Sequence, residues 1–166
     1  MSTLLLDAEA IYADLLKGVR KLMRPDSALV GIWSGGAWLA ERLQSDLCLT
    51  GSAGVISSSL HRDDFGSRGM SASADHTKLP FDVSGRHILL IDDVLFTGRT
   101  TRAVINELFD FGRPASVTLA VLVDRGGREL PIEPAFSAAR IHLAAEQRLR
   151  LAKDADGRFS FDLKGD

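Results

Sequence analysis

The sequence predicts an α/β fold in which a mainly parallel β-sheet is covered by helices on both faces. Short apolar runs, typical of strands buried on both sides, occur at 28–33, 88–91 and 116–123. The first two are each followed by a glycine-containing turn and then by a segment with helical periodicity, at 37–47 and 103–111. A repeated strand–turn–helix pattern favours parallel strands, because the crossover helix returns the chain to the same edge of the sheet.

Length and composition indicate one soluble domain. The chain has 166 residues, of which 45% are hydrophobic and 25% are charged, and this is enough for a single core. We expect a cytoplasmic protein without a membrane partner, because no apolar run is long enough to span a bilayer and the N-terminus does not resemble a signal peptide. A net charge of −2 argues against a generally basic nucleic-acid binder but allows a local basic face.

Cysteine and histidine give little evidence for metal or redox chemistry. The single cysteine, Cys48, excludes an intrachain disulfide and is expected to be a small core residue. His61, His76, His87 and His142 lack the spacing of metal ligands, so ordinary surface or core positions are favoured for them.

The first half of the chain predicts two helices and two strands. Residues 7–23 form an amphipathic helix, with Asp7 near its start and Pro25 after its end. The strand at 28–33 breaks at Ser34-Gly35-Gly36, where the missing Cβ atoms would let a ligand approach the backbone, although a plain turn is an equal alternative. A further strand is expected at 53–60.

A long polar segment follows at 61–81. Arg62, Asp63 and Asp64 stand at its start, which suits a loop that closes over a charged ligand. A solvated excursion without function is the competing interpretation.

The stretch 86–101 carries the strongest chemical signal. The strand at 88–91 should stop at Asp92, because burying Asp92 and Asp93 unpaired would cost too much free energy, so both acids should emerge at the carboxyl edge of the sheet. The segment 97–101 then offers a glycine, hydroxyl groups and backbone N–H groups before the helix at 103–111. This combination predicts a phosphate-binding loop.

The last third is less clearly patterned. The strand at 116–123 leads into Asp124, Arg125 and further charged residues. Residues 141–143 and 159–161 could be short strands with a turn at 156–157, whereas 146–153 is equally compatible with a helix.

Several phosphate-binding sites can be excluded. The chain has neither the Gly-x-x-x-x-Gly-Lys-Ser/Thr motif of nucleoside triphosphatases nor the Gly-x-Gly-x-x-Gly motif of dinucleotide-binding proteins. The acids of a receiver domain would lie near the start of the chain. The remaining candidate ligand is a sugar phosphate, with its hydroxyl groups held by the carboxylates and its phosphate held by the loop.

Segment 88–100 resembles the phosphoribosyl-pyrophosphate (PRPP) signature of the type I phosphoribosyltransferases, with an apolar strand, two acids and Thr-Gly. Segments 60–65, 92–100, 112–116 and 119–132 are similar to the pyrimidine operon attenuation proteins, which are also uracil phosphoribosyltransferases. The resemblance implies the type I phosphoribosyltransferase fold with a small hood. It also implies one domain over 1–166, with a core at 28–132 and the N-terminal helix and C-terminal region as hood or edge elements.

The resemblance also implies roles for individual residues in forming UMP from uracil and PRPP. Asp92 and Asp93 would be catalytic and contact the ribose, and Mg²⁺ would bridge pyrophosphate and ribose oxygens. The other implied positions are Thr97, Gly98, Arg99, Thr100 and Thr101 for the 5′-phosphate, Ser34, Gly35 and Gly36 for pyrophosphate, Arg62, Asp63 and Asp64 for the flexible loop, and Asp124, Arg125 and Arg128 for the uracil side. For the two arginines, a salt-bridged surface position is an equal alternative.

Three departures from the family pattern stand out. Ser34-Gly35-Gly36 replaces a common Thr-Arg-Gly, so a cation that would face pyrophosphate is missing. Ser57 and its neighbours replace a common acidic Leu-Asp-Ile-Thr, and the region after Phe136 lacks a run with lysine and threonine.

Two functional hypotheses therefore stand side by side. The first is a uracil phosphoribosyltransferase. The second is a UMP-sensing regulator that binds the leader RNA of a pyrimidine operon, with activity weak or absent. Its candidate basic surface comprises Lys17, Arg20, Lys21, Arg24, Arg140, Arg148, Arg150 and Lys153. The resemblance also implies a homo-oligomer.

Overall fold

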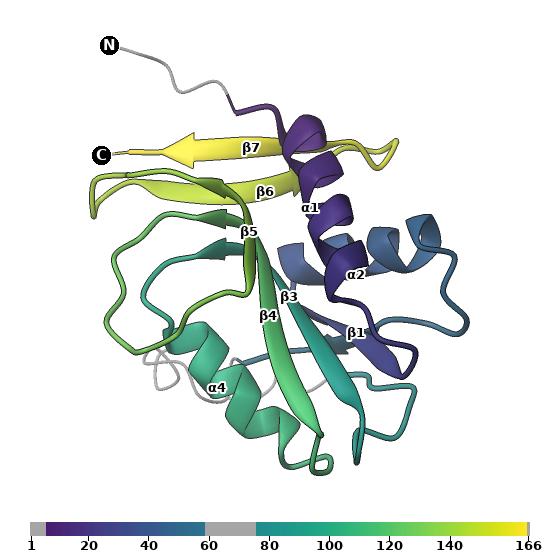
Figure 1. The fold of residues 1–166 in the computed structure, drawn as a ribbon. Helices are drawn as coiled ribbons and strands as arrows, with labels where there is room; N and C mark the ends of the chain where they lie inside the picture. The colour runs from purple at the N-terminus through teal and green to yellow at the C-terminus, as the bar shows by residue number, and fades with distance from the viewer. Residues whose placement is uncertain (1–5, 59–75, 166) are drawn as a thin grey trace.

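A five-stranded parallel sheet forms the centre of the molecule (Figure 1). The computed structural model describes residues 6–58 and 76–165, and the spatial order of the strands is β2-β1-β3-β4-β5. The strands are β1 (Ser27–Ile32), β2 (Gly54–Ile56), β3 (His87–Leu95), β4 (Ser116–Asp124) and β5 (Phe136–Arg140). The predicted parallel sheet is confirmed.

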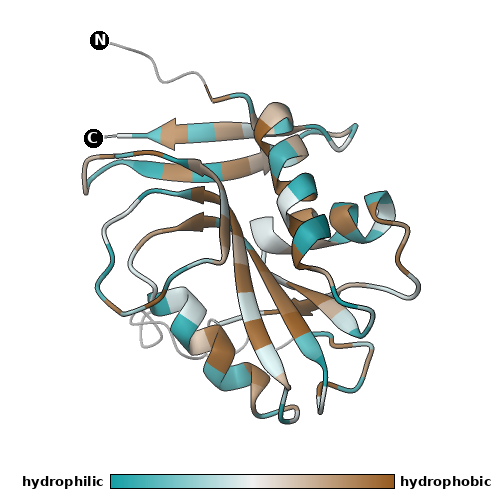
Figure 2. Cartoon of the chain, in the orientation of Figure 1, coloured by the Kyte–Doolittle hydropathy of each residue, from teal (hydrophilic) through white to brown (hydrophobic). Residues whose placement is uncertain are grey.

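Helices cover both faces of this sheet, as the sequence predicts. Helices α1 (Ala8–Leu22) and α2 (Gly35–Asp46) lie on one face, and α4 (Arg99–Leu108) lies on the other (Figure 1). Alternate strand residues supply two cores, so that Leu89 packs on the α1 and α2 side while Leu90 packs on the α4 side. The central strands are accordingly apolar along most of their length (Figure 2). In the described part of the chain, no helix is long and apolar enough to cross a membrane.

Two C-terminal strands form a separate antiparallel hairpin, β6 (Arg148–Lys153) and β7 (Phe159–Lys164), which we call the hood hairpin. It lies across the carboxyl ends of the sheet strands (Figure 1). The helical alternative for 146–153 is wrong, because Leu149 and Leu151 are buried while Arg148 and Arg150 are exposed, an alternation of period two. The turn at 156–157 is confirmed, but the strand expected at 141–143 lies instead at 136–140.

Three other local expectations are corrected. Helix α4 spans 99–108 instead of 103–111, because Gly98 at φ 91° starts it earlier, and Phe111 lies beyond its end with half of its surface exposed. Of the strand expected at 53–60, residues 53–58 are described, and among them β2 spans 54–56. Residues 59 and 60 lie outside the described residues.

Cys48 is exposed and not in the core. It takes a left-handed conformation (φ 54°) just after α2, where its N–H donates to the Ser45 carbonyl (3.0 Å). The next N–H, of Leu49, donates to the Gln44 carbonyl (3.1 Å). This pair of bonds is a Schellman motif, which places Cys48 at the turn that ends the helix.

Candidate active site

The two acids lie within β3, not after its end. The strand continues to Leu95 beside β4, so the expectation that it stops at Asp92 is wrong. Asp92 is only 7% exposed, and one of its oxygens accepts the N–H of Asp93 (2.9 Å). Its burial is therefore tolerated because the carboxylate is hydrogen-bonded, a possibility that residue type alone does not reveal.

Asp93 is the more open acid, on the α2 side of the strand. Its Oδ1 accepts the N–H of Val94 (2.9 Å), and its carboxylate borders a pocket. The structure thus gives the neighbouring carboxylates different surroundings. Asp92 is enclosed by the sheet, whereas Asp93 can meet a ligand.

The segment Ser34-Gly35-Gly36 lies directly against Asp93. Ser34 precedes α2, and both glycines are buried in its first turn. A Cβ on Gly35 would overlap the Asp93 carboxylate, and one on Gly36 would overlap the Ile91 carbonyl. The missing side chains therefore permit this close approach, and the chain enters the turn through a cis Trp33–Ser34 peptide bond.

The segment 97–101 forms the start of α4 at the same edge of the sheet. Gly98 is the N-cap residue, and the Arg99 N–H donates to Thr97 Oγ1 (3.2 Å). The first backbone N–H groups of a helix attract anions, so the expected phosphate loop has suitable geometry. Thr101 differs from its neighbours, because it is 1% exposed and its Oγ1 is enclosed in the protein.

Asp124 and Arg128 form an ion pair that supports the loop after β4. Arg128 Nη2 lies 2.6 Å from Asp124 Oδ2, and the same guanidinium donates to the Phe96 and Ile132 carbonyls (2.8 Å each). Burial raises the pKa of Asp124, but the hydrogen bonds from Arg128 and from the Gly126 N–H outweigh it and leave the pKa below its usual value.

Arg125 is buried, at 6% exposure, so the alternative of a salt-bridged surface position does not describe it. Its guanidinium donates to the carbonyls of Gln147 (2.7 Å) and Ala144 (2.9 Å) and lies 4.0 Å from the centre of the Phe96 ring. It therefore holds the segment before β6 against the end of β3.

A pocket of about 490 Å³ lies beneath the hood hairpin, a size typical of small-molecule sites. Its lining includes Asp93, Val94, Phe96, Thr100, Arg125, Ala145, Gln147, Arg148, Leu149 and Arg150. Of the residues predicted for the site, Asp93, Thr100 and Arg125 line this cavity, whereas Ser34, Gly35 and Gly36 are not among its lining residues. Arg62, Asp63 and Asp64 lie outside the described residues.

Seven of the ten lining residues were not predicted as part of the pocket, namely Val94, Phe96, Ala145, Gln147, Arg148, Leu149 and Arg150. For the two arginines a signal was present, because Arg-Leu-Arg-Leu over 148–151 alternates with the period of a strand. Phe96 lies inside the predicted motif, but nothing in the sequence pattern distinguishes it as a wall of the pocket.

The donor set suits a magnesium ion that is held largely by its substrate. Among residues 6–58 and 76–165, no group of three or more potential metal ligands is found. The carboxylate of Asp93, the more open of the two acids, is a hard oxygen donor that borders the pocket, and Mg²⁺ commonly binds one or two such groups together with substrate phosphates. The residues present are therefore compatible with a Mg²⁺–pyrophosphate complex.

Comparisons with known proteins agree with this geometry. Residues 5–142 match the family model of the phosphoribosyl transferase domain. The bifunctional protein PyrR of Ralstonia nicotianae is 51% identical over 97% of this chain and 96% of its own, and that of Nitrosococcus oceani is 45% identical over 88% and 86%.

Solved structures show the same fold at lower sequence identity. A hypoxanthine phosphoribosyltransferase from Staphylococcus aureus has a TM-score of 0.63 at 23% identity, covering 85% of this chain and 77% of its own. A Trypanosoma cruzi enzyme of that name (K68R mutant, ternary substrates complex) has a TM-score of 0.64 at 21% identity, covering 84% and 82%.

Proposed function

The chain belongs to the phosphoribosyl transferase family, and we propose that it is a uracil phosphoribosyltransferase that forms UMP and pyrophosphate from uracil and PRPP. The observation that carries the proposal is the contact of Gly35 with the Asp93 carboxylate beside the start of α4. A carboxylate, a close-approach glycine turn and a helix N-terminus thus meet at one sheet edge. The high similarity to proteins named bifunctional protein PyrR favours uracil as the base.

In the proposed reaction, the bond from C1 of the ribose to pyrophosphate breaks and the bond from C1 to uracil N1 forms, with loss of the N1 proton. Positive charge develops on the ribose as pyrophosphate leaves. The Asp93 carboxylate borders the pocket in which this charge would develop, so it would stabilise the transition state electrostatically. Asp92, enclosed behind it, would fix the strand that carries Asp93.

The phosphate groups would bind at two helix starts. The N–H groups at the beginning of α4, with the Thr97 and Thr100 hydroxyls, would hold the 5′-phosphate. The backbone of Ser34, Gly35 and Gly36 would receive pyrophosphate at the start of α2. Bound Mg²⁺ would neutralise the charge of the leaving group, which matters more here because this turn has no side-chain cation.

The base would lie in the pocket beneath the hood hairpin. Phe96, the Arg125 guanidinium stacked on it, Gln147 and Arg148 line this pocket. Because both hydrogen-bonded arms of Arg125 are engaged with carbonyl groups, its proposed role is to shape this pocket.

Product analysis tests the proposal. Uracil, PRPP and Mg²⁺ are incubated with the protein, and UMP is measured by chromatography while PRPP binding is measured by calorimetry. We expect UMP to form in proportion to enzyme. PRPP binding without UMP above background would reject the enzyme and leave the regulator hypothesis.

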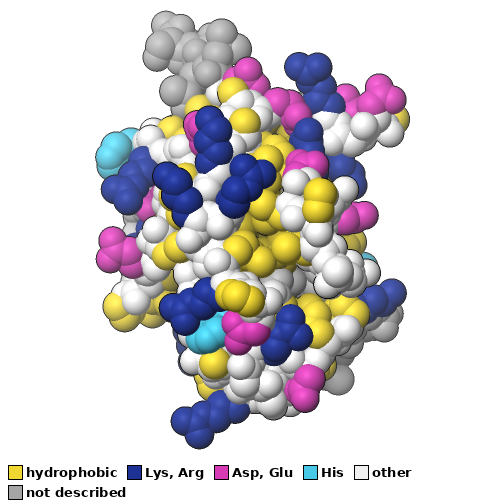
Figure 3. Space-filling view, turned by 45° about the vertical axis from the view of Figure 1, so that its right-hand side comes forward, with side chains coloured by type: hydrophobic (Ala, Val, Ile, Leu, Met, Phe, Trp, Pro, Cys, Tyr) yellow, Lys and Arg dark blue, Asp and Glu magenta, His cyan; other side chains and the backbone are white. Residues whose placement is uncertain are grey.

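RNA binding is the second candidate function, favoured by the relatives' printed name "bifunctional" and by exposed basic residues on α1. Lys17, Arg20 and Lys21 are exposed there, whereas Arg148 and Arg150 border the pocket. On the face in Figure 3, Lys and Arg side chains are interspersed with acidic ones around a hydrophobic patch. We therefore propose that an RNA-binding surface would consist mainly of the basic residues on α1.

We also propose that the protein forms a homo-oligomer, and light scattering can measure its mass in solution.

A further inference from the structure

Helix α2 begins at the turn proposed to receive pyrophosphate. Gly35 lies against the Asp93 carboxylate, and Gly36 lies against the backbone of β3. On the other side, a Cβ on Gly31 of β1 would overlap the Gly36 carbonyl. The first turn of α2 is therefore fixed between two strands without intervening side chains, and a shift of this turn would be transmitted along the helix.

The same helix supports the hood hairpin one and two turns further on. The Lys153 ammonium at the end of β6 lies 5.1 Å from the centre of the Trp38 ring. The Arg42 guanidinium packs over two neighbouring rings, 4.8 Å from the centre of Phe159 at the start of β7 and 4.4 Å from that of Tyr12, and the two ring centres are 5.7 Å apart. Trp38 and Arg42 are four residues apart, so they share one face of α2.

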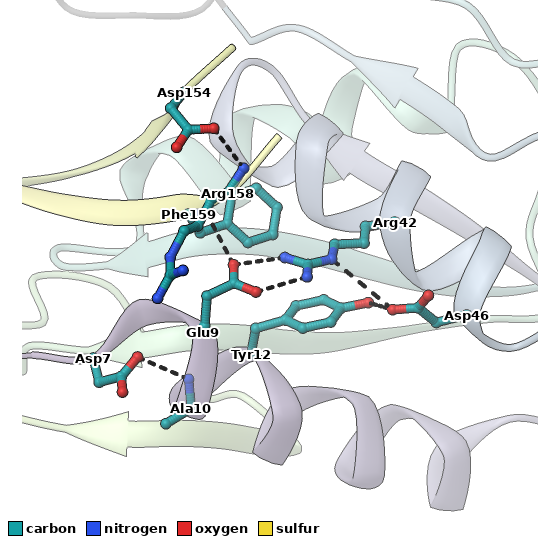
Figure 4. Close-up of polar contacts among 9 residues, drawn as sticks. All are labelled: Asp7, Glu9, Ala10, Tyr12, Arg42, Asp46, Asp154, Arg158 and Phe159. Carbon is teal, nitrogen blue, oxygen red and sulfur yellow. Dashed lines mark hydrogen bonds and ion pairs between the residues drawn. The ribbon is translucent and has the colours of Figure 1, made fainter. Parts of the chain in front are cut away.

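Glu9 completes this attachment from α1 (Figure 4). It accepts two hydrogen bonds from Arg42, each 2.7 Å long, and one from the backbone N–H of Phe159 (2.9 Å). We call the set Glu9, Tyr12, Arg42 and Phe159 the hood clamp. Planar, two-pronged bonding of this kind fixes orientation as well as distance.

The clamped hairpin also forms part of the pocket. Strand β6 runs from Arg148, which borders the pocket, to Lys153, which contacts α2. A strand of six residues is stiff over about 17 Å. Movement of α2 at Arg42 and Trp38 would therefore move the pocket wall at Arg148 and Arg150.

We propose that α2 couples occupancy of the Ser34–Gly36 turn to the position of the hood hairpin, with Arg42 and Trp38 as positioning residues for nucleotide binding. This inference rests on the proposed function, since it assumes that pyrophosphate and UMP are the two ligands. Neither residue lines the pocket, so both act through the hairpin.

The test measures the affinity for UMP by calorimetry with and without Mg²⁺–pyrophosphate. In the unmodified protein, we expect pyrophosphate to strengthen UMP binding by about fivefold, a typical coupling between two sites. Arg42→Met should bring this factor close to one while leaving the affinity for pyrophosphate alone nearly unchanged. Arg113→Met, at the opposite end of the sheet, is the matched control and should keep the full factor.

A second measurement uses the two tryptophans of the chain, Trp33 and Trp38. In the Trp33→Phe protein, only Trp38 emits, and pyrophosphate should change its emission. Lys153→Met should reduce both the change in Trp38 emission and the factor by which pyrophosphate strengthens UMP binding. This variant replaces Arg42→Met in the test if Arg42→Met does not fold.

The outcomes separate the two proposals. Independent binding of UMP and pyrophosphate to the unmodified protein, or an unchanged factor in folded Arg42→Met, would overturn the coupling and leave the proposed function standing. A protein that binds no UMP at all would overturn both.

Discussion

The carboxylate of Asp93 lies where three segments of the chain meet: the end of β3, the first turn of α2 and the pocket beneath the hood hairpin. Its neighbour Asp92 is buried, at 7% exposure, and its carboxylate accepts a hydrogen bond from the backbone N–H of Asp93. Adjacent strand residues point to opposite faces, which is why two identical side chains acquire different surroundings. We infer that Asp93 acts on the ligand and that Asp92 holds the strand.

Replacing each acid by asparagine tests this division. Asp93→Asn keeps an acceptor for the Val94 N–H but loses the charge, so we expect kcat to fall about 100-fold. The free energy of unfolding should change by less than about 1 kcal/mol. Asp92→Asn should lower the free energy of unfolding by about 1–3 kcal/mol, because it disturbs a buried hydrogen-bonded group. Steady-state rates and urea unfolding measure both, and equal losses of stability would contradict the assignment.

Gly35→Ala tests the close approach of the turn. The added Cβ would overlap the Asp93 carboxylate, so either the turn or the acid must shift. We expect loss of most activity and a stability cost of about 1–3 kcal/mol, typical of overpacking. Gly165→Ala is the control, since its Cβ would meet only the Gln147 side chain at ordinary contact distance. Full activity in Gly35→Ala would show that the turn does not need this contact.

Among the elements, the hood clamp makes stability depend on pH. The hydrogen bonds from Arg42 lower the pKa of Glu9, and they outweigh burial, which raises it. The folded protein therefore binds fewer protons here than the unfolded chain. The resulting stabilisation is complete above the unfolded pKa of about 4.3 and is lost as the pH falls through the lower folded pKa.

We accordingly expect Glu9→Gln to be less stable than the unmodified protein at pH 7. The difference should shrink as the pH falls below about 4. Denaturant unfolding across pH 3–7 measures it, with Glu41→Gln, at an exposed position on α2, as the control. A difference that stays constant with pH would contradict a charged clamp.

The elements that sequence patterns predicted well are those with clear periodicity. The helix at the N-terminus, with Asp7 as its cap, and the central strands have the predicted positions. The end of β3 was missed because the strand continues to Leu95 by pairing with β4, and pairing with a distant strand is not visible in a local pattern. The strand β6 was missed although residues 148–151 alternate with the period of a strand, because an alternation over only four residues does not decide against a helix.

In the candidate site, too, local features could be predicted from the sequence and long-range contacts could not. Contacts made near one motif were predictable, since Asp93 and the start of α4 are close in sequence. The junction of Gly35 with Asp93 required only the rule that parallel strands end at one edge. The hood wall at Arg148 lies 55 positions beyond Asp93, and the clamp joins Glu9 to Phe159 over 150 positions. One sequence does not encode contacts over such separations in any local pattern.

In the molecule as a whole, the proposed active-site edge of the sheet and the exposed face of α1 offer two separate surfaces. If α1 binds RNA, affinity should fall steeply with salt, because the phosphate backbone releases counterions when Lys and Arg bind it. We expect Lys17→Ala combined with Arg20→Ala to weaken binding to pyrimidine-operon leader RNA by about tenfold without changing UMP synthesis. Gel shifts at rising salt, with and without UMP, measure this. RNA binding that does not depend on the salt concentration would argue against α1 as the RNA-binding surface.

We propose that this edge of the sheet transfers a phosphoribosyl group to uracil. The most direct test supplies PRPP labelled in the ribose, with Mg²⁺, and a panel of uracil, cytosine, orotate and hypoxanthine, with Asp93→Asn as the parallel control. We expect labelled UMP from uracil alone, and far less of it from the variant. Label transferred preferentially to another base, or equal transfer by Asp93→Asn, would contradict the account.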